Sequence, residues 1–224
     1  MPEGSSGTRA GNVTSIAPEG RRLQLRTLEA LLFASGDPMP EREIARHMPE
    51  GADIRALLTD LQTGYAGRGV NLRRIGDCWA FRTAEDIAPL LRHHVVEERK
   101  LSRAALETLA IIAYHQPVTR AEIEGIRGVS VSSGTLDVLL ETGWVRLRGR
   151  RRSPGRPLTF GTTVGFLDHF GLEAITDLPG LEELKAAGML EGMLPPGLAA
   201  PTPDDRASLA EDEDPLEPAD DGSG

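Results

Sequence analysis

One pattern of helices and strands occurs twice along the chain, and it limits the possible folds more than any other sequence feature. The stretch Leu-Glu-Ala-Leu-Leu that begins at Leu28 returns as Leu-Glu-Thr-Leu-Ala at Leu106, 78 positions later. Apolar residues at i, i+3 and i+4 in both stretches predict amphipathic helices. Pro38 and Pro117 end both helical patterns, because proline lacks the N–H that a helix interior needs. Two similar units in tandem are therefore expected.

Each unit continues with the same succession of elements. A second short helix contains a Glu-Ile pair, a third helix follows, and alternating apolar residues then predict two strands. In chain order these pieces are predicted at 43–44, 54–61 and 70–81 in the first unit and at 122–123, 136–140 and 145–160 in the second. Helix, helix, helix, strand, turn, strand is the order of a winged helix, a helix-turn-helix closed by a β-hairpin called the wing.

The chain is thus expected to be mainly α-helical with small β-wings, an α+β fold of two tandem winged-helix domains. The ends lack apolar periodicity, which is typical of disordered segments. The predicted boundaries are 1–20 for a disordered leader, 21–97 for the first domain, 101–187 for the second domain with added helices at Val164–Phe170 and Leu178–Ala187, and 195–224 for a disordered acidic tail.

The net charge of −9 is concentrated in that tail. Residues 201–224 hold nine acids and one arginine, so they carry −8 and the rest of the chain carries −1. A strongly negative chain is unlike proteins that wrap nucleic acid electrostatically. We expect the tail to be solvated, and the alternative is a tail that competes with acidic ligands for a basic surface.

The second wing is the basic surface of the chain. Residues 146–156 contain no acid and six arginines: Arg146, Arg148, Arg150, Arg151, Arg152 and Arg156. Guanidinium groups on a hairpin can contact phosphates without reading base sequence, which would allow non-specific DNA binding. In the alternative interpretation these arginines pair with neighbouring acids or are solvated.

The third helices do not favour base reading, for which Arg, Lys, Asn or Gln near the helix start are typical. The polar residues available are Asp53, Arg55, Asp60 and Gln62 in the first unit and Ser132, Ser133, Thr135, Asp137 and Glu141 in the second. A winged-helix transcription regulator therefore remains the alternative function rather than the first.

The sequence also argues against an enzyme, with no catalytic, cofactor-binding or metal residue assigned. Cys78 is the only cysteine, so it forms no disulfide within the chain, and it lacks the third group of a catalytic triad if His93 or His94 is taken as a base. The five histidines lack metal-site spacing. Without a signal peptide or a ~20-residue apolar stretch, a cytoplasmic protein with no membrane contact is expected.

The second unit resembles the bacterial segregation and condensation protein B (ScpB) family. The resemblance lies in the stretch from Leu106 to Val129, which contains Ala-Tyr-His-Gln-Pro-Val-Thr-Arg, and extends through the motifs of the wing and the helix after it. These motifs are Leu139-Leu-Glu-Thr-Gly-Trp144, Gly149-Arg150, Pro154-Gly-Arg-Pro157, Gly161-Thr-Thr163, Phe166-Leu167, Phe170-Gly-Leu172 and Asp177-Leu-Pro179. The similar region covers about 22–187. Phe160 stands where the family commonly has a tyrosine or tryptophan.

This resemblance implies a non-catalytic, nucleoid-associated scaffold without a cofactor. Members of the family form homodimers, largely through the first winged helix, and bind the kleisin subunit ScpA, which bridges an SMC ATPase in chromosome condensation and segregation during cell division. The residues that match the family pattern, and are therefore expected to contact the partner, are Tyr114, Arg150, Pro154, Gly155, Arg156, Pro157, Phe166 and Phe170. Phe166 and Phe170, four positions apart, are expected on one helix face, whereas Trp144 and Phe160 are expected in the core.

Overall fold

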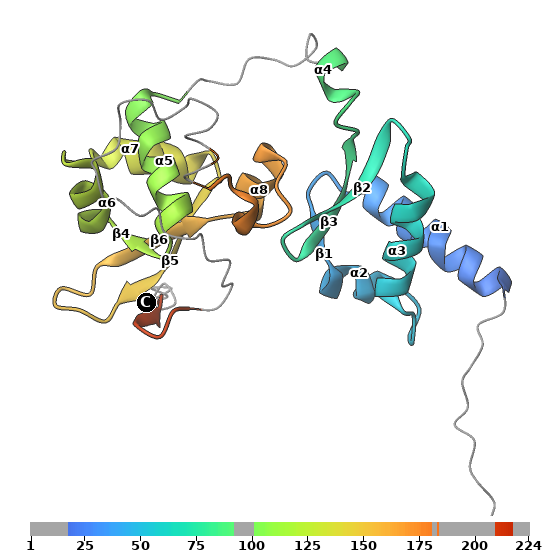
Figure 1. Cartoon of the computed structure of the whole chain (residues 1–224). Coiled ribbons are helices and arrows are strands. Elements are labelled where there is room, and N and C mark those ends of the chain that lie inside the picture. Colours follow the sequence, from blue (N-terminus) through green and yellow to red (C-terminus); the bar gives the residue numbers. More distant parts are fainter. Residues whose placement is uncertain (1–17, 92–100, 181–182, 184–208, 217–224) are drawn as a thin grey trace, which may run out of the picture.

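The structure, a computed structural model of the 224-residue chain, describes residues 18–91, 101–180, 183 and 209–216. Two units of similar topology are visible in Figure 1, and residues 92–100 connect them in the sequence. Each unit packs three helices against a small antiparallel sheet. The predicted pair of winged helices is confirmed.

The first unit consists of seven elements within residues 18–91. They are α1 (Pro18–Ala34), β1 (Met39–Pro40), α2 (Glu41–His47), α3 (Ile54–Tyr65), β2 (Val70–Ile75), β3 (Cys78–Thr83) and α4 (Ala88–Leu91). The strand order is β1-β3-β2, with both pairs antiparallel. Leu28, Ile44, Leu57 and Leu72, one from each of the three helices and the hairpin, are almost fully buried together.

The second unit repeats this order and adds elements after the hairpin. They are α5 (Arg103–His115), β4 (Val118–Thr119), α6 (Arg120–Arg127), α7 (Ser133–Glu141), β5 (Val145–Arg151), β6 (Leu158–Thr162), α8 (Val164–Phe170), a 3₁₀ turn (Ile175–Asp177) and β7 (Glu213–Pro215). The strand order is β4-β6-β5-β7. Leu109, Ile112, Ile123 and Leu139 form its buried core with Phe160.

Local side-chain chemistry explains where the helices of the second unit begin. The hydroxyls of Ser102, Ser132 and Thr163 accept hydrogen bonds from backbone N–H groups in the first turns of α5, α7 and α8. Thr119 and Glu122 form a reciprocal capping box at the start of α6. These caps satisfy N–H groups that have no partner within the helix.

Three of the predicted boundaries are wrong. Helix α1 starts at Pro18, so residues 18–20 belong to a helix and not to the leader. Leu178 does not start a helix, because Asp177 accepts a hydrogen bond from the N–H of Ala174 and closes the 3₁₀ turn instead. Part of the acidic tail, 209–216, is ordered and contains β7. The remaining residues of the leader, the tail and the helix predicted at 178–187 lie outside the described residues, except Glu183, which is helical.

Candidate functional site: the basic wing and its neighbours

The wing of the second unit is a rigid hairpin with an exposed turn. β5 and β6 pair antiparallel with an irregularity between Leu147 and Arg150. At the turn, Gly155 has a φ of 84° and Arg156 a φ of 41°, both in the left-handed region. The Arg156 N–H donates to the Ser153 carbonyl. The predicted contact residues Pro154, Gly155 and Arg156 are therefore exposed on a turn of fixed shape.

Carboxylates pair with most of the wing arginines, and most of these carboxylates come from the C-terminal segment. The ion pairs are Arg148–Glu213 (3.6 Å), Arg151–Glu122 (2.9 Å), Arg151–Asp212 (2.8 Å), Arg152–Asp214 (2.7 Å) and Arg156–Asp214 (3.2 Å). Arg146 and Arg150 donate to the backbone carbonyls of Thr162 and Arg156. Of the two interpretations of the basic wing, this arrangement favours pairing with acids over free phosphate-binding groups.

The carboxyl groups of these pairs respond to the arginines. The pKa of Asp214 is lowered, chiefly by its hydrogen bond with Arg152 and also by Arg156. Burial by itself would raise the pKa of Glu122, but the N–H of Thr119 and the guanidinium of Arg151 hold it below the ordinary value of 4.5. Both carboxylates therefore stay ionised well below neutral pH, and the wing stays paired.

The aromatic residues of the second unit divide between core and surface. Phe166 is only 3% exposed and belongs to the core, so its ring has little surface to offer a partner. Phe170 is 47% exposed, and its ring lies 5.6 Å from that of the partly buried Trp144 and 4.7 Å from that of Phe166. Tyr114 is partly buried, and its hydroxyl donates to the Pro179 carbonyl. Phe170 is thus the exposed member of an otherwise packed aromatic cluster.

The third helices, α3 and α7, carry one basic side chain between them, the exposed Arg55. On α3, Arg55 pairs with Glu41 at 3.2 Å. On α7, the hydroxyl of Ser132 is used locally, since it accepts a hydrogen bond from the N–H of Thr135 and caps the helix. One arginine that is paired with a carboxylate gives these helices little capacity to read bases in the major groove.

Cys78 is buried on β3 and does not resemble a catalytic thiol. Burial, with a smaller effect of the neighbouring Asp77 carboxylate, raises the pKa of the thiol to about 12. A thiol that remains protonated at neutral pH is a poor nucleophile.

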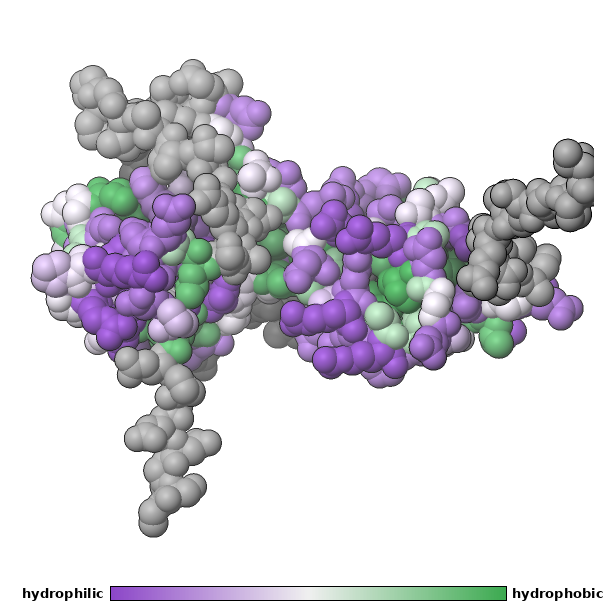
Figure 2. Space-filling view, turned by 90° about the horizontal axis from the view of Figure 1, so that it is seen from below, coloured by the Kyte–Doolittle hydropathy of each residue, from purple (hydrophilic) through white to green (hydrophobic). Residues whose placement is uncertain are grey.

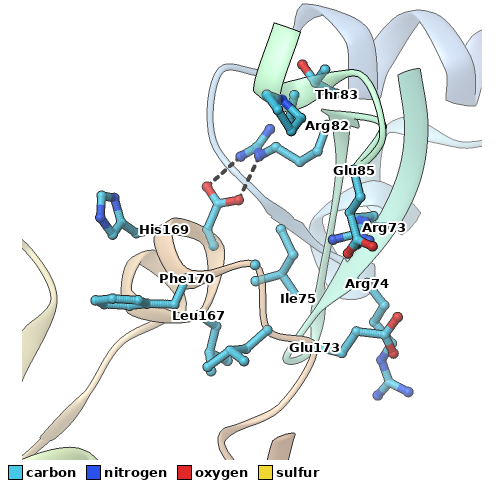
Figure 3. A pocket seen from close by; sticks show the side chains of 15 residues that line it. Arg73, Arg74, Ile75, Arg82, Thr83, Glu85, Leu167, His169, Phe170 and Glu173 are labelled. Atoms are coloured by element: carbon cyan, nitrogen blue, oxygen red, sulfur yellow. Dashed lines mark hydrogen bonds and ion pairs between the residues drawn. The ribbon is translucent and has the colours of Figure 1, made fainter. Parts of the chain in front are cut away.

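The two units meet at a cleft of about 460 Å³ that the sequence did not predict (Figure 3). Arg82 of β3 donates two hydrogen bonds, of 2.6 and 2.7 Å, to the carboxylate of Asp168 on α8. The Gly76 N–H donates to the Glu173 carbonyl at 2.6 Å. Figure 3 shows charged side chains from both units around this contact, Arg73 and Glu85 among them. Because Arg82 and Asp168 are 86 positions apart, no local sequence signal links them.

The surface seen from below is largely hydrophilic, with separate hydrophobic patches between the hydrophilic residues (Figure 2). No group of three or more potential metal-binding side chains occurs within the described part of the chain. Of the helices that the structure describes, none is long and apolar enough to span a membrane.

Comparison with known proteins identifies relatives over most of the chain. Residues 26–181 match the sequence model of a family described as segregation and condensation complex subunit ScpB. The chain is 44% identical over 165 residues to segregation and condensation protein B of Desulforamulus reducens, covering 72% of this chain and 91% of the relative. It is 39% identical over 163 residues to the segregation and condensation protein B homolog of Coxiella burnetii, covering 70% and 78%.

Solved structures with similar sequences include two ScpB proteins. ScpB from Mycobacterium tuberculosis is 34% identical, with coverage of 68% of this chain and 97% of that chain and a TM-score of 0.32. A dimer of an ScpB N-terminal domain complexed with an ScpA peptide is 29% identical, with coverage of 33% and 96% and a TM-score of 0.30.

Proposed function

We propose that this chain, which belongs to the ScpB family of segregation and condensation complex subunits, is a non-catalytic dimeric subunit that binds the kleisin ScpA. The observation that carries this function is the extent of the family match, because residues 26–181 span both winged helices. Through ScpA the chain joins an SMC ATPase, and it supports chromosome condensation and segregation in the cytoplasm, at the nucleoid. The ATP chemistry belongs to that partner.

The first unit offers a surface for the homodimer. Leu23 and Phe33 on α1 are 62% and 77% exposed, and Leu90 on α4 is 70% exposed. Exposed large apolar side chains such as these can contribute to a protein interface when they lie together in one patch. Phe33→Asp is expected to convert the dimer to a monomer, as measured by light scattering after size exclusion. The control is Leu106→Asp, which places the same charge on an exposed leucine of the second unit and should leave the dimer intact.

The second unit offers an exposed aromatic side chain for the kleisin. Phe170 on α8 is the side chain that we assign to ScpA binding. Tyr114 and the turn 154–157 also match the family pattern and are assigned to the same partner. Phe170→Ala is expected to weaken binding of an ScpA fragment by about tenfold or more, as hot-spot aromatics do. The control is Val129→Ala, since Val129 is 57% exposed elsewhere on the same unit. Equal affinities of the two variants would contradict the assignment.

The mass of the chain alone and with ScpA tests the function as a whole. A dimer has twice the 24.1 kDa of the chain, and the complex is heavier by the bound kleisin. A monomer that fails to bind ScpA would overturn the proposal. Sequence-specific DNA binding that survives moderate salt would instead support the transcription regulator, whereas weak, salt-sensitive binding reports phosphate contact alone.

A further inference from the structure

The C-terminal segment 209–216 lies along the wing as an added strand. β7 pairs antiparallel with β5, with Gly149 opposite Pro215, Arg150 opposite Asp214 and Arg151 opposite Glu213. The N–H of Arg152 extends this ladder by donating to the Asp212 carbonyl at 2.7 Å. Without β7, the N–H and C=O groups on this side of β5 would form a free sheet edge, which is a template for another strand.

Two glycines shape the surface that receives this strand. A Cβ at Gly149 would overlap the carbonyl oxygen of Asp214 and lie 3.0 Å from Cδ2 of Leu209. A Cβ at Gly161 on β6 would lie 2.6 Å from Cδ of Arg148. The first glycine thus lets an extended backbone approach β5, and the second makes room for the Arg148 side chain beneath it.

The charges of β7 and the wing are complementary both in the buried centre of their contact and along its exposed margin, called the rim below. At the centre, the side chains of Arg148 and Glu213 are 4% and 0% exposed and lie 3.6 Å apart. At the rim, Asp214 lies within 3.2 Å of both Arg152 and Arg156. Because a buried charge is stabilised by a partner of opposite sign, the carboxylate of Glu213 suits the buried Arg148 at this position of the strand.

We propose that the edge of β5 and the wing arginines form a binding site for an extended acidic peptide, and that residues 209–216 of the same chain occupy this site in cis. A peptide fits better than nucleic acid for two reasons. Only a polypeptide supplies the alternating N–H and C=O groups that continue the β5 ladder. The buried Arg148 is reached by a carboxylate that projects from a strand seated against Gly149.

Occupation in cis closes the site to other acidic peptides. Residues 181–208 tether the strand to the second unit, and a tether gives the occupant an effective concentration of the order of millimolar. A free acidic peptide has to displace this segment from the intact chain. It therefore binds the intact chain much more weakly than it binds a chain in which residues 209–216 are detached from β5. This inference does not depend on the ScpA assignment, since it rests on the wing alone.

The experiment uses full-length chains and a fluorescein-labelled peptide of residues 207–218, with binding measured by fluorescence anisotropy. Glu213→Lys/Asp214→Lys removes the two acids that contact Arg148 and the rim, so it should empty the site. We expect this variant to bind the peptide at least about tenfold more tightly than the wild-type chain does. The charge-matched control is Asp204→Lys/Asp205→Lys, outside the paired segment, which should behave as the wild type does.

The outcomes separate the site from a general effect of charge. Equal peptide affinities for all three chains, or an equal gain in the control, would overturn the proposal. A gain in binding to a labelled DNA duplex without a gain in peptide binding would overturn the choice of ligand. Arg152→Glu, added to the emptied variant, reverses an exposed charge at the rim and should weaken peptide binding by about tenfold. Unchanged affinity in that variant would place the peptide elsewhere.

A disulfide tests whether the strand belongs to the same molecule. Arg150 and Asp214 face each other across the β5–β7 ladder, at a separation that a disulfide can bridge. In Cys78→Ala/Arg150→Cys/Asp214→Cys, mild oxidation should give a product of monomer mass on a non-reducing gel. Cross-linked dimers as the main product would show that a second copy supplies the strand, and would overturn occupation in cis.

Discussion

Cys78 shows how the surroundings of a single residue decide its chemistry. Burial raises the pKa of its thiol to about 12, so the reactive thiolate is scarce at neutral pH. We predict that iodoacetamide at pH 7 leaves Cys78 of the folded chain unmodified, as measured by intact mass, while the chain in guanidinium chloride gains one adduct. Rapid modification of the folded chain would contradict the burial of this thiol.

Glu122 is a residue whose ionisation should make stability depend on pH. Its pKa is below 4.5 in the folded chain because the hydrogen bonds from Thr119 and Arg151 outweigh its burial. A carboxyl with a lowered pKa stabilises the fold above the pKa of the unfolded chain, and this stabilisation is lost as the pH falls below it. We predict that the free energy of unfolding, measured in urea, decreases below pH 4.5 and decreases less in Glu122→Gln. Equal decreases in both chains would show that Glu122 contributes nothing to the pH dependence of the free energy of unfolding.

At the scale of elements, the buried and exposed faces of α5 differ sharply in how well they tolerate a charged substitution. Leu109 is 3% exposed and packs in the core of the second unit, whereas Leu106 on the same helix is 50% exposed. Leu109→Asp buries a charge without a partner, which costs several kcal/mol, comparable with the whole stability of a small domain. We predict that it unfolds the second unit and lowers the helical circular dichroism signal. Leu106→Asp is the matched control and should keep the signal of the wild-type chain.

At the scale of the whole molecule, a small contact joins the two units. Arg82 pairs with Asp168 between β3 and α8, beside the buried apolar residues Ile75 and Leu167, and small contacts between domains usually permit relative motion. We predict that Arg82→Asp separates the units and raises the radius of gyration in small-angle scattering by about 2 Å or more. Arg82→Asp/Asp168→Arg should restore the wild-type value. Arg21→Asp breaks a pair inside the first unit and serves as the control.

The sequence predicted the elements well where one residue pattern dominates. Apolar residues at helical spacing placed α1, α3, α5 and α7, and Val164–Phe170 was predicted at the bounds of α8. Only the start predicted at Leu178 is wrong, because Asp177 can cap either a helix or a 3₁₀ turn, and here it closes the turn next to the buried Ile175. Phe166 and Phe170 share a helix, but the sequence does not say which of them faces the core.

The candidate site was predicted only in part. The cluster of wing arginines and the acidic tail are both visible in the sequence. A tail that competes with acidic ligands for a basic surface was one of two alternatives left open, and a solvated tail was the other. The segment 211–214, Glu-Asp-Glu-Asp, has no apolar alternation, so nothing local marks it as a strand. β7 pairs with the edge of β5 and brings Glu213 to Arg148, and both partners are in place only when the wing is folded.

The sequence by itself determined that this chain folds as two winged helices, because amphipathic periodicity and turn residues act over a few positions, and its motifs matched the chain to the ScpB family. Only the tertiary structure decided which charges meet. Arg82 finds Asp168, and Arg148 finds Glu213, across separations of 86 and 65 positions. Such pairs depend on the distance between atoms in space, which packing sets and the order of residues along the chain does not reveal.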